Sequence, residues 1–426
     1  MLVQSAPPPL RGDDTAWMLV STALVLLMTP ALGFFYGGLV RRKNVLNTIM
    51  MSLASVGVVG LAWAFLGYSL AFTPGTAWLG GLGHALLRGV GLDAGPWGAF
   101  PQLLFFAYQG SFAIITAALV SGAVVERMRF GAYVLFIVLW SLLVYAPVAH
   151  WVWGGGWLGQ LGALDFAGGT VVHINAGAAA LVCARVVGSR KDYGRQAFLP
   201  HNVPYVLLGA ALLWFGWFGF NGGSALSAGP VAALAFTNTL LGPAATLLMW
   251  MLLELFRTGR PTAVGAATGA VVGLVAITPA AGFIAPTSAI LLGALAALPS
   301  YFMILWRPRT ALDDSLDVFA AHGLGGIVGA LLTGVFAQQA WNAPTDGLIA
   351  GNVRLLGVQA AAIGAVFAYS AAITFGLLKL IDLGVALRRS ENEEGVGMDV
   401  IQHGEEAYSR GEGAVLVLER RGPTRE

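Results

Sequence analysis

The sequence has little charge and almost no cysteine. Only 10% of its 426 residues are charged, whereas 57% are hydrophobic, and the mean hydropathy is +0.75. A soluble globule of this length needs far more charged side chains to cover its surface, so the composition excludes that class and predicts an all-α polytopic membrane protein. The near-neutral net charge of +2 gives no indication of a polyanionic partner, and we expect no nucleic-acid binding.

The single cysteine restricts the chemistry further. Cys183 lies in an apolar segment and has no second thiol to pair with. An intrachain disulfide, a thiolate metal cluster and a redox pair are therefore excluded.

What the chain does have is many long apolar runs without charge. A membrane-crossing helix needs about 20 such residues, and breaks at Pro, Gly and charge clusters divide the chain into eleven runs. The uncharged stretch 261–306 counts as two helices, because Pro279, Gly282 and Pro286 interrupt it. The predicted spans are 15–39, 45–72, 98–125, 130–150, 168–184, 203–222, 229–253, 262–278, 286–306, 318–338 and 355–378.

The basic residues between these spans fall mainly on one side of the membrane. Short cytoplasmic loops retain positive charge, so we expect the N-terminus outside and the C-terminus in the cytoplasm. An odd number of helices allows two inverted five-helix repeats followed by a final helix. Only Arg11, Arg88 and Arg354 fall outside, whereas the inner side carries Arg41, Arg42, Lys43, Arg127, Arg129, Arg185, Arg190, Lys191, Arg195, Arg257, Arg260, Arg307 and Arg309.

This topology divides the chain into three parts. Residues 1–14 form an extracellular N-terminal segment, 15–387 the membrane domain and 388–426 a cytoplasmic tail. The tail is polar and acidic on balance, and it is too short for an independent enzymatic domain.

Two histidines lie in otherwise uncharged apolar stretches. His173 follows Asp165, and His322 follows Asp314, by the same eight residues. An ionisable residue at membrane depth indicates a functional site. If the repeats are inverted, the two aspartates start at opposite faces and the two imidazoles meet near the midplane. Small residues after each histidine would let the two helices approach closely.

Other interpretations of these residues stay open. The histidines could be core residues bonded to backbone carbonyls, or they could hold a metal ion, although no third ligand is evident beside them. Asp165 could be a helix N-cap, and a capped carboxylate still adds a negative field that favours a cation at the outer mouth.

Aromatic side chains gather near the predicted outer ends. A membrane-interface belt explains most of the tryptophans. Trp153, Phe112 and Phe220, however, lie among glycines, and their ring faces could bind a cation that is losing its water. The hydroxyl of Ser224 could accept a hydrogen bond from an N–H donor.

Five sequence strings resemble the ammonium transporter family (Amt/Mep/Rh), specifically its bacterial Amt branch. They are FFYGGLVRRKNVLN, AHWVWGGGWL, DFAGGTVVHINAG, FGWFGFNGGSA and DVFAAHGLGGIVG, and the resemblance covers about residues 14–409. It implies an eleven-helix protomer that assembles as a homotrimer in the cytoplasmic (inner) membrane of the cell, with a pore in each protomer. The tail string GMDVIQHGEEAY also resembles the family's regulatory C-terminus and implies a PII-type signalling protein as partner.

The resemblance also implies residue roles, in a transporter rather than an enzyme, with no cofactor, no metal and no catalytic residue. Phe112, Trp153 and Ser224 match an outer ammonium-recruitment site that Asp165 supports. Phe112 and Phe220 match a gate, and His173, His322 and Trp217 match the pore lining, while Tyr108 stands where many members have another aromatic residue.

The expected function is ammonium transport. Ammonium would lose its proton outside, ammonia would pass the two histidines, and the proton would cross separately, so that the net uptake is electrogenic. Two alternatives remain: an ammonium sensor, and an Rh-type channel for neutral ammonia or carbon dioxide. The intact WVWGGGW string favours the Amt branch.

Overall fold

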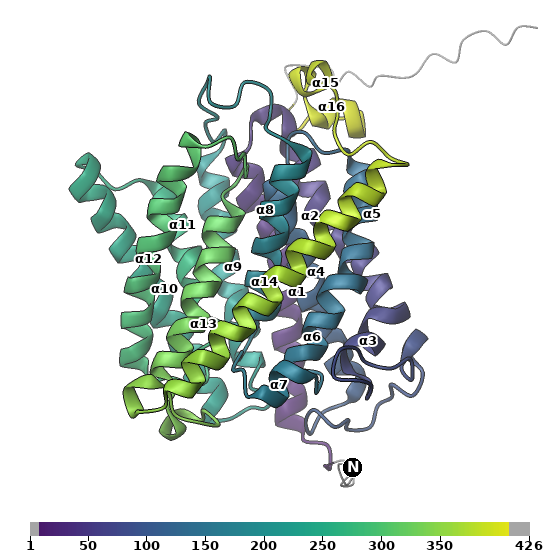
Figure 1. Cartoon of the computed structure of the whole chain (residues 1–426), viewed down its shortest axis with the longest axis vertical. Coiled ribbons are helices and arrows are strands. Elements are labelled where there is room, and N and C mark those ends of the chain that lie inside the picture. The colour runs from purple at the N-terminus through teal and green to yellow at the C-terminus, as the bar shows by residue number, and fades with distance from the viewer. Residues whose placement is uncertain (1–7, 409–426) are drawn as a thin grey trace, which may run out of the picture.

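The computed structural model describes residues 8–408, and in that range the chain is a bundle of long helices (Figure 1). Its only extended pairings there are two isolated bridges, Ala94 with Pro101 and Met128 with Arg388. The all-α class is therefore confirmed for the described chain. The predicted N-terminal segment and tail lie partly outside the described residues, which exclude 1–7 and 409–426.

Ten helical segments of the described chain are long and apolar enough to cross a membrane, as judged by length and composition. An eleventh apolar helix, α11, has only 15 residues. The segments are α1 (Gly12–Leu39); α2 (Val45–Ala62) with η2 (Trp63–Gly67) and α3 (Tyr68–Phe72); α4 (Gln102–Val120); α5 (Phe130–Trp140) with η5 (Ser141–Tyr145), α6 (Ala146–Val152) and α7 (Trp157–Leu161); η6 (Gly169–Ile174) with α8 (Asn175–Val187); α9 (Val203–Gly223); α10 (Pro230–Thr258); α11 (Ala263–Ile277); α12 (Pro286–Trp306); η8 (Phe319–Leu324) with α13 (Gly325–Phe336); and α14 (Val353–Asp382).

The helix boundaries follow local sequence signals. The predicted division of 261–306 is confirmed, because α11 ends at Ile277 and α12 starts at Pro286. Thr262 caps α11 by accepting a hydrogen bond from the backbone N–H of Gly265. The helix predicted from residue 98 starts only at Gln102, because the preceding residues form a turn held by the Ala94–Pro101 bridge.

Glycines let the long helices cross at short range. A Cβ atom on Gly209 of α9 would lie 2.3 Å from the backbone nitrogen of Phe35 on α1. A Cβ on Gly293 of α12 would lie 2.1 Å from the carbonyl oxygen of Gly242 on α10. In both pairs the backbones are in contact, as small residues permit in membrane helices.

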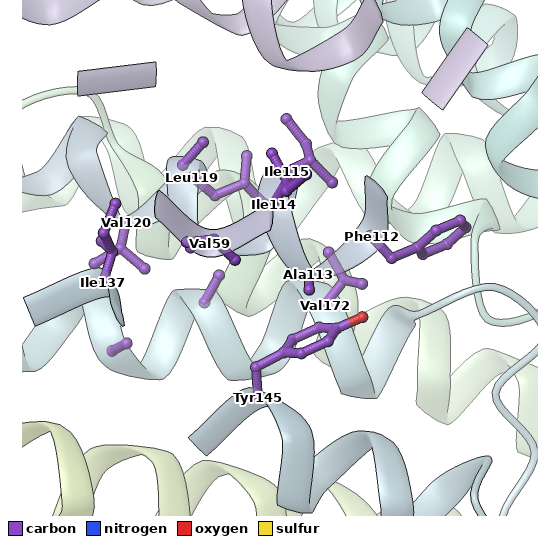
Figure 2. Packing of buried hydrophobic residues seen from close by; sticks show 14 of the residues in the cluster. Val59, Phe112, Ala113, Ile114, Ile115, Leu119, Val120, Ile137, Tyr145 and Val172 are labelled. Atoms are coloured by element: carbon purple, nitrogen blue, oxygen red, sulfur yellow. The ribbon is translucent and has the colours of Figure 1, made fainter. Parts of the chain in front are cut away.

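The core surrounds α4. Figure 2 shows Val59 of α2, Ile137 of α5, Tyr145 of η5 and Val172 of η6 around the side chains of this helix, all of them buried. This packing holds η6 and its histidine against the centre of the bundle.

The two ends of the bundle differ in charge. The start of α1 lies at one end, and the tail helices α15 (Glu391–Val396) and α16 (Met398–His403) lie at the other (Figure 1). At the tail end, Lys43 donates to the carbonyl oxygen of Gly395, and the backbone N–H of Lys191 donates to Glu394. Basic residues predicted to share one side of the membrane thus gather at this end, which we call the tail end.

Candidate pore and binding site

Both histidines lie on single-turn π-helices. His173 is on η6 and His322 is on η8, and each turn leads directly into an α-helix. The backbone N–H of His173 donates to the carbonyl oxygen of Gly168, 3.0 Å away. A π-turn contains more residues per turn than an α-helix and therefore changes the direction in which side chains point, which is why such turns are frequent at functional sites.

Asp165 organises the first of these turns. Its Oδ1 atom accepts hydrogen bonds from the backbone N–H groups of Gly168 and Gly169, and its Oδ2 atom from those of Thr170 and Val171, at 2.7–3.0 Å. Gly168, with φ +121°, adopts a backbone conformation that favours glycine. Asp165 thus caps the helix, in agreement with the N-cap interpretation, and the helix begins at Gly169, one residue after the predicted start at 168. Both carboxylate oxygens already accept backbone hydrogen bonds. Asp165 therefore influences the neighbouring side chains through its electric field and not through a direct contact.

Asp314 repeats this arrangement incompletely. Its Oδ2 atom accepts a hydrogen bond from the backbone N–H of Phe319 at 2.7 Å. Three residues after each aspartate the backbone turns with a positive φ, which is +57° at Asp317. Burial and the nearby charge of Asp317 raise the pKa of Asp314 to about 6. The Asp165 and Asp314 segments share their backbone pattern, but the carboxylate of Asp314 accepts fewer hydrogen bonds than that of Asp165.

The two imidazoles meet, as the repeated spacing predicts. The Nδ1 atoms of His173 and His322 lie 3.2 Å apart, and both residues are buried. A Cβ on Gly177 would lie 2.4 Å from the Cα of Gly323, so only small residues allow this approach. One ring must donate a proton in this contact and the other must accept it, so at least one ring is neutral.

Aromatic rings continue the row from His173. Phe220 lies 6.0 Å from His173 between ring centroids, and Phe112 lies 4.1 Å from Phe220 in a stacked arrangement. Trp217 stacks beside His173 at 5.4 Å with an interplanar angle of 23°. The stacked phenylalanines leave no space between their rings, so they close this side of the histidine pair.

A second group of predicted residues gathers beyond the phenylalanines. Trp153 approaches Phe112 edge to face at 6.1 Å, and its indole N–H donates to the carbonyl oxygen of Asp165 at 2.9 Å. The hydroxyl of Ser224 donates to the carbonyl oxygen of Phe220 at 2.8 Å. The structure therefore brings all eight predicted site residues into one row: Phe112, Trp153, Asp165, His173, Trp217, Phe220, Ser224 and His322.

Two further polar residues belong to this row. The Thr278 hydroxyl accepts the indole N–H of Trp217 at 2.8 Å, which holds the ring against His173. The hydroxyl oxygens of Tyr108 and Ser224 lie 3.2 Å apart. The sequence alone assigns no role to Tyr108 and does not single out Thr278. The only local signal for Thr278 is a threonine directly before Pro279 at the end of an apolar helix.

On its other side the histidine pair borders a cavity at the tail end. This cavity has a volume of about 870 Å³, and His322 lines it. Aromatic and charged side chains line it together, among them Tyr36, Trp250, Tyr301, Arg307 and Asp317. The histidines thus separate a closed aromatic side from an open, partly polar side.

Metal binding has no support in this arrangement. Between residues 8 and 408, no three His, Cys, Asp or Glu side chains are grouped closely enough to hold a metal ion. A stable site needs at least three protein ligands.

A bundle of membrane-length helices around a buried histidine pair, with stacked aromatic rings on one side and a cavity on the other, defines a polytopic membrane protein with a pore-like path. Comparison with known proteins identifies the family. The model of the Ammonium Transporter Family matches residues 16–408, and the chain belongs to that family.

Curated relatives and solved structures agree with this assignment. The ammonium transporter of Bacillus subtilis (strain 168) is 50% identical over 402 residues, which cover 94% of this chain and 99% of that protein. Ammonium transporter Amt1 of Archaeoglobus fulgidus is 46% identical, covering 94% and 100%. The crystal structure of Saccharomyces cerevisiae Mep2 superimposes with a TM-score of 0.88 at 36% identity, covering 95% and 93%. A sensor Amt protein superimposes with a TM-score of 0.85 at 27% identity, covering 92% and 98%.

Proposed function

We propose that this chain transports ammonium by recruiting the ion at Trp153, Phe112 and Ser224, removing its proton and conducting ammonia past the histidines. The observation that carries the proposal is the order of the groups: aromatic faces, a stacked phenylalanine pair and then two imidazoles in contact. Aromatic faces attract a cation, and the field of Asp165 adds to that attraction. An enzymatic activity is not part of this proposal.

The physical reason for deprotonation is the cost of burying an ion. Ammonium in a narrow apolar passage would lose its hydration, and cation–aromatic contacts of about 0.5–2 kcal/mol each recover only part of that free energy. Neutral ammonia avoids most of this cost. Potassium has no proton to lose and is therefore rejected. If the proton crosses separately, with the histidines as relay, the net uptake is electrogenic.

The proposed topology has eleven crossing helices, with α11 as the shortest. The similarity between Asp165–His173 and Asp314–His322, each with a positive φ and a π-turn, supports two inverted five-helix repeats followed by α14. The basic tail end is then cytoplasmic, and the start of α1 is outside. We further propose a homotrimer in the cytoplasmic membrane, as the family resemblance implies.

The tail is proposed to be a regulatory element that binds a PII-type signalling protein. Its described part is attached to the membrane domain: Asp399 accepts a hydrogen bond from the backbone N–H of Asn47 at 2.8 Å, and Gln402 accepts one from that of Phe130 at 2.6 Å. Purified full-length protein should bind a PII-type protein in at least one nucleotide condition, and a chain ending at Leu387 should not. No association in any condition would contradict this partner.

Electrophysiology on supported membranes tests the transport proposal. Vesicles with the reconstituted protein should give a current after an ammonium pulse and none after an equal potassium pulse. Equal currents for the two ions would remove the selectivity argument. Protein-free vesicles provide the control.

Two other functions predict different results. A neutral-gas channel would acidify or alkalinise the vesicle lumen without a current, so a pH-sensitive dye inside the vesicles distinguishes it. A sensor would bind ammonium without producing a current. The structural similarity to a sensor Amt protein is the reason to test for this function. The described chain ends in only two short tail helices, α15 and α16.

A further inference from the structure

The buried face of α14 carries three polar side chains. This helix runs obliquely across the bundle (Figure 1) and packs against α8 and α13. Its buried residues recur mainly every three or four positions, so they form one stripe along the helix. The polar members of the stripe are Gln359, Ser370 and Thr374, each at most 1% exposed. A polar side chain buried this deeply needs a hydrogen-bond partner, so each of the three marks a specific contact.

Gln359 bonds to the backbone of Leu164, one residue before Asp165. Its Oε1 atom accepts the backbone N–H of Leu164 at 2.8 Å, and its Nε2 atom donates to the carbonyl oxygen of the same residue at 2.8 Å. Leu164 is buried and lies in irregular backbone between α7 and η6. Buried backbone groups outside a helix need partners from side chains. The Gln359 amide therefore fixes the backbone at Leu164.

The next residue makes the contacts that hold the outer site together. The carbonyl oxygen of Asp165 accepts the indole N–H of Trp153 at 2.9 Å, and its carboxylate caps η6. On the far side, the backbone N–H of Phe166 donates to the carbonyl oxygen of Pro279 at 3.1 Å. Because Asp165 lies between two held residues, a displacement at Leu164 would move both the Trp153 ring and the start of η6.

The same amide reaches the helix that follows the second histidine. Its Nε2 atom also donates to the carbonyl oxygen of Ala330 on α13, at 3.0 Å. Gly334, one turn further along, leaves room for this contact, because a Cβ atom there would lie 3.1 Å from Cγ of Gln359. Both amide hydrogens are thus used, and the segment before Asp165 is tied to α13.

Ser370 holds the other end of the segment that carries His173. Its hydroxyl donates to the carbonyl oxygen of Asn175, the first residue of α8, at 2.8 Å. Eleven residues separate Gln359 from Ser370, and the same number separates Leu164 from Asn175. An α-helix rises about 1.5 Å per residue, so α14 sets its two attachment points about 16 Å apart.

We propose that α14 fixes the spacing between the outer ammonium site and the histidine pair, with Gln359 and Ser370 as positioning residues. Gln359 positions the recruitment site through Asp165, and Ser370 positions the His173 ring through the start of α8. This inference rests on the proposed function of the row. It gives the final helix, which lies outside the two proposed repeats, a role in transport.

Ammonium current from reconstituted full-length protein, normalised to the amount of protein, tests the role of Gln359. Gln359→Met keeps the length of the side chain but leaves the Leu164 backbone without its partners. We expect KM for ammonium to rise about tenfold, as for the loss of a buried hydrogen bond. The maximal current should stay within about twofold of wild type, because recruitment is weakened and the later steps are not. An unchanged KM would overturn the role.

Gln359→Glu provides a milder change at the same position. Glutamate keeps the length, the acceptor and at most one donor. Its KM should therefore lie between the values of wild type and Gln359→Met. If the methionine variant does not fold, an unchanged KM in Gln359→Glu overturns the role in its place.

Ser370→Ala should give the opposite pattern. It removes the bond to Asn175 at the histidine end and leaves the Leu164 contact intact. We expect the maximal current to fall about fivefold, which corresponds to one net hydrogen bond, with KM within about twofold of wild type. The same pattern in Ser370→Ala and Gln359→Met would indicate a general loss of structure and would overturn the proposal.

Thr374 provides the matched control on the same face of α14. Its hydroxyl accepts the indole N–H of Trp140 on α5 at 3.0 Å, a bond that involves neither Leu164 nor Asn175. Thr374→Val removes one buried hydrogen bond, so the unfolding midpoint should fall as in Ser370→Ala. KM and maximal current should match wild type. A change in either quantity would show that lost stability alone explains the effects, and it would overturn the proposal.

NMR of the Trp153 indole reports the position of Asp165 without any transport. Full-length protein labelled with ¹⁵N-tryptophan is measured in lipid nanodiscs, and the signal lost in Trp153→Phe belongs to Trp153. We expect the indole proton signal to move upfield in Gln359→Met, because its bond to Asp165 lengthens, and to stay in place in Thr374→Val. An unshifted signal in Gln359→Met would overturn the proposal. A failure of the proposed function would appear instead as a missing ammonium current in the wild-type protein.

Discussion

The Nδ1 atoms of His173 and His322 are 3.2 Å apart, although 149 residues separate the two histidines in the chain. The contact needs one proton between the two nitrogens, so the pair works as a unit: removing either ring leaves the other without its partner. The row of aromatic rings reaches this pair from one side, and the cavity at the tail end reaches it from the other.

Replacing both His173 and His322 with leucine should abolish the ammonium current. Leucine has a similar volume and no titratable proton, so packing is retained while the proposed proton relay is removed. Electrophysiology on reconstituted vesicles measures the current, and thermal unfolding should show a midpoint at or above that of wild type. The control is His84→Leu, outside the row. An unchanged current in the double variant would show that the pair is structural.

Replacing Asp165 with asparagine should destabilise the protein. The carboxylate accepts four backbone N–H groups, and an amide can accept only at its single oxygen. Each buried N–H group left without an acceptor costs about 1–3 kcal/mol, so the free energy of unfolding should fall by at least about 2 kcal/mol.

Thermal unfolding and ammonium current should decline together in Asp165→Asn. Asp13→Asn is the control, because the Asp13 side chain is 51% exposed. Unchanged stability with a lost current would indicate instead that Asp165 contacts the substrate directly.

The buried ion pairs of Arg190 should make stability depend on acid pH. Its guanidinium, with a side chain 4% exposed, bonds Glu126 at 2.7 Å and Asp313 at 2.8 Å. Burial alone would raise the pKa of Glu126 and of Asp313. Arg190 acts together with Arg41 at Glu126, and with Arg127 at Asp313, and the net effect is that both pKa values are lowered. Lowered pKa values contribute stability that is complete above the unfolded carboxyl pKa of about 4 and is lost as pH falls below it.

Arg190→Met should weaken this pH dependence. It removes the hydrogen-bonded cation of Asp313 and leaves Glu126 with Arg41, at 3.0 Å, as its ion-pair partner. Removing one partner of a buried pair costs about 3–5 kcal/mol, and the stability gained above the carboxyl pKa should be smaller than in wild type. Thermal unfolding across pH 3–8 in lipid nanodiscs measures both proteins, with the exposed Arg195→Met in the same loop as control. Parallel pH curves for Arg190→Met and wild type would contradict the assignment.

Thr278→Val should weaken transport by releasing Trp217. Valine has nearly the same shape but cannot accept the indole N–H, and an unbonded buried donor costs about 1–3 kcal/mol. We expect a lower ammonium current and a lower unfolding midpoint. Thr278→Ser keeps the hydroxyl and should restore both measurements. Equal loss in the serine and valine variants would show that the methyl group, rather than the hydrogen bond, is responsible.

Much of the site could be predicted because it depends on spacing along the chain. The equal intervals from Asp165 to His173 and from Asp314 to His322 predicted that the rings meet, and glycines at 177 and 323 allow the approach. The family resemblance supplied roles for Phe112, Trp153, Ser224, Phe220 and Trp217, and the structure brings these residues together.

Other features could not be predicted from local pattern. Apolar periodicity does not distinguish a π-turn from an α-helix, because both bury the same side chains, so 168–184 was expected to be a continuous α-helix. How Asp165 caps that helix could not be predicted for a related reason. A carboxylate four residues ahead can cap the turn only when the intervening backbone folds back, and that depends on the positive φ of Gly168.

By itself, the sequence determined that this is a multi-span helical membrane protein and which residues could form its site. Run length, charge scarcity and small-residue spacing are properties of consecutive positions, and the bilayer and the helix convert them directly into structure. Only the tertiary structure decided which buried polar groups meet. Three contacts join residues far apart in the chain: the indole of Trp217 bonds to Thr278, Arg190 pairs with Glu126 and Asp313, and the His150 ring lies between two carbonyl groups. Hydrogen bonds act only within about 3.5 Å, and such a distance between remote residues exists only after the helices have packed.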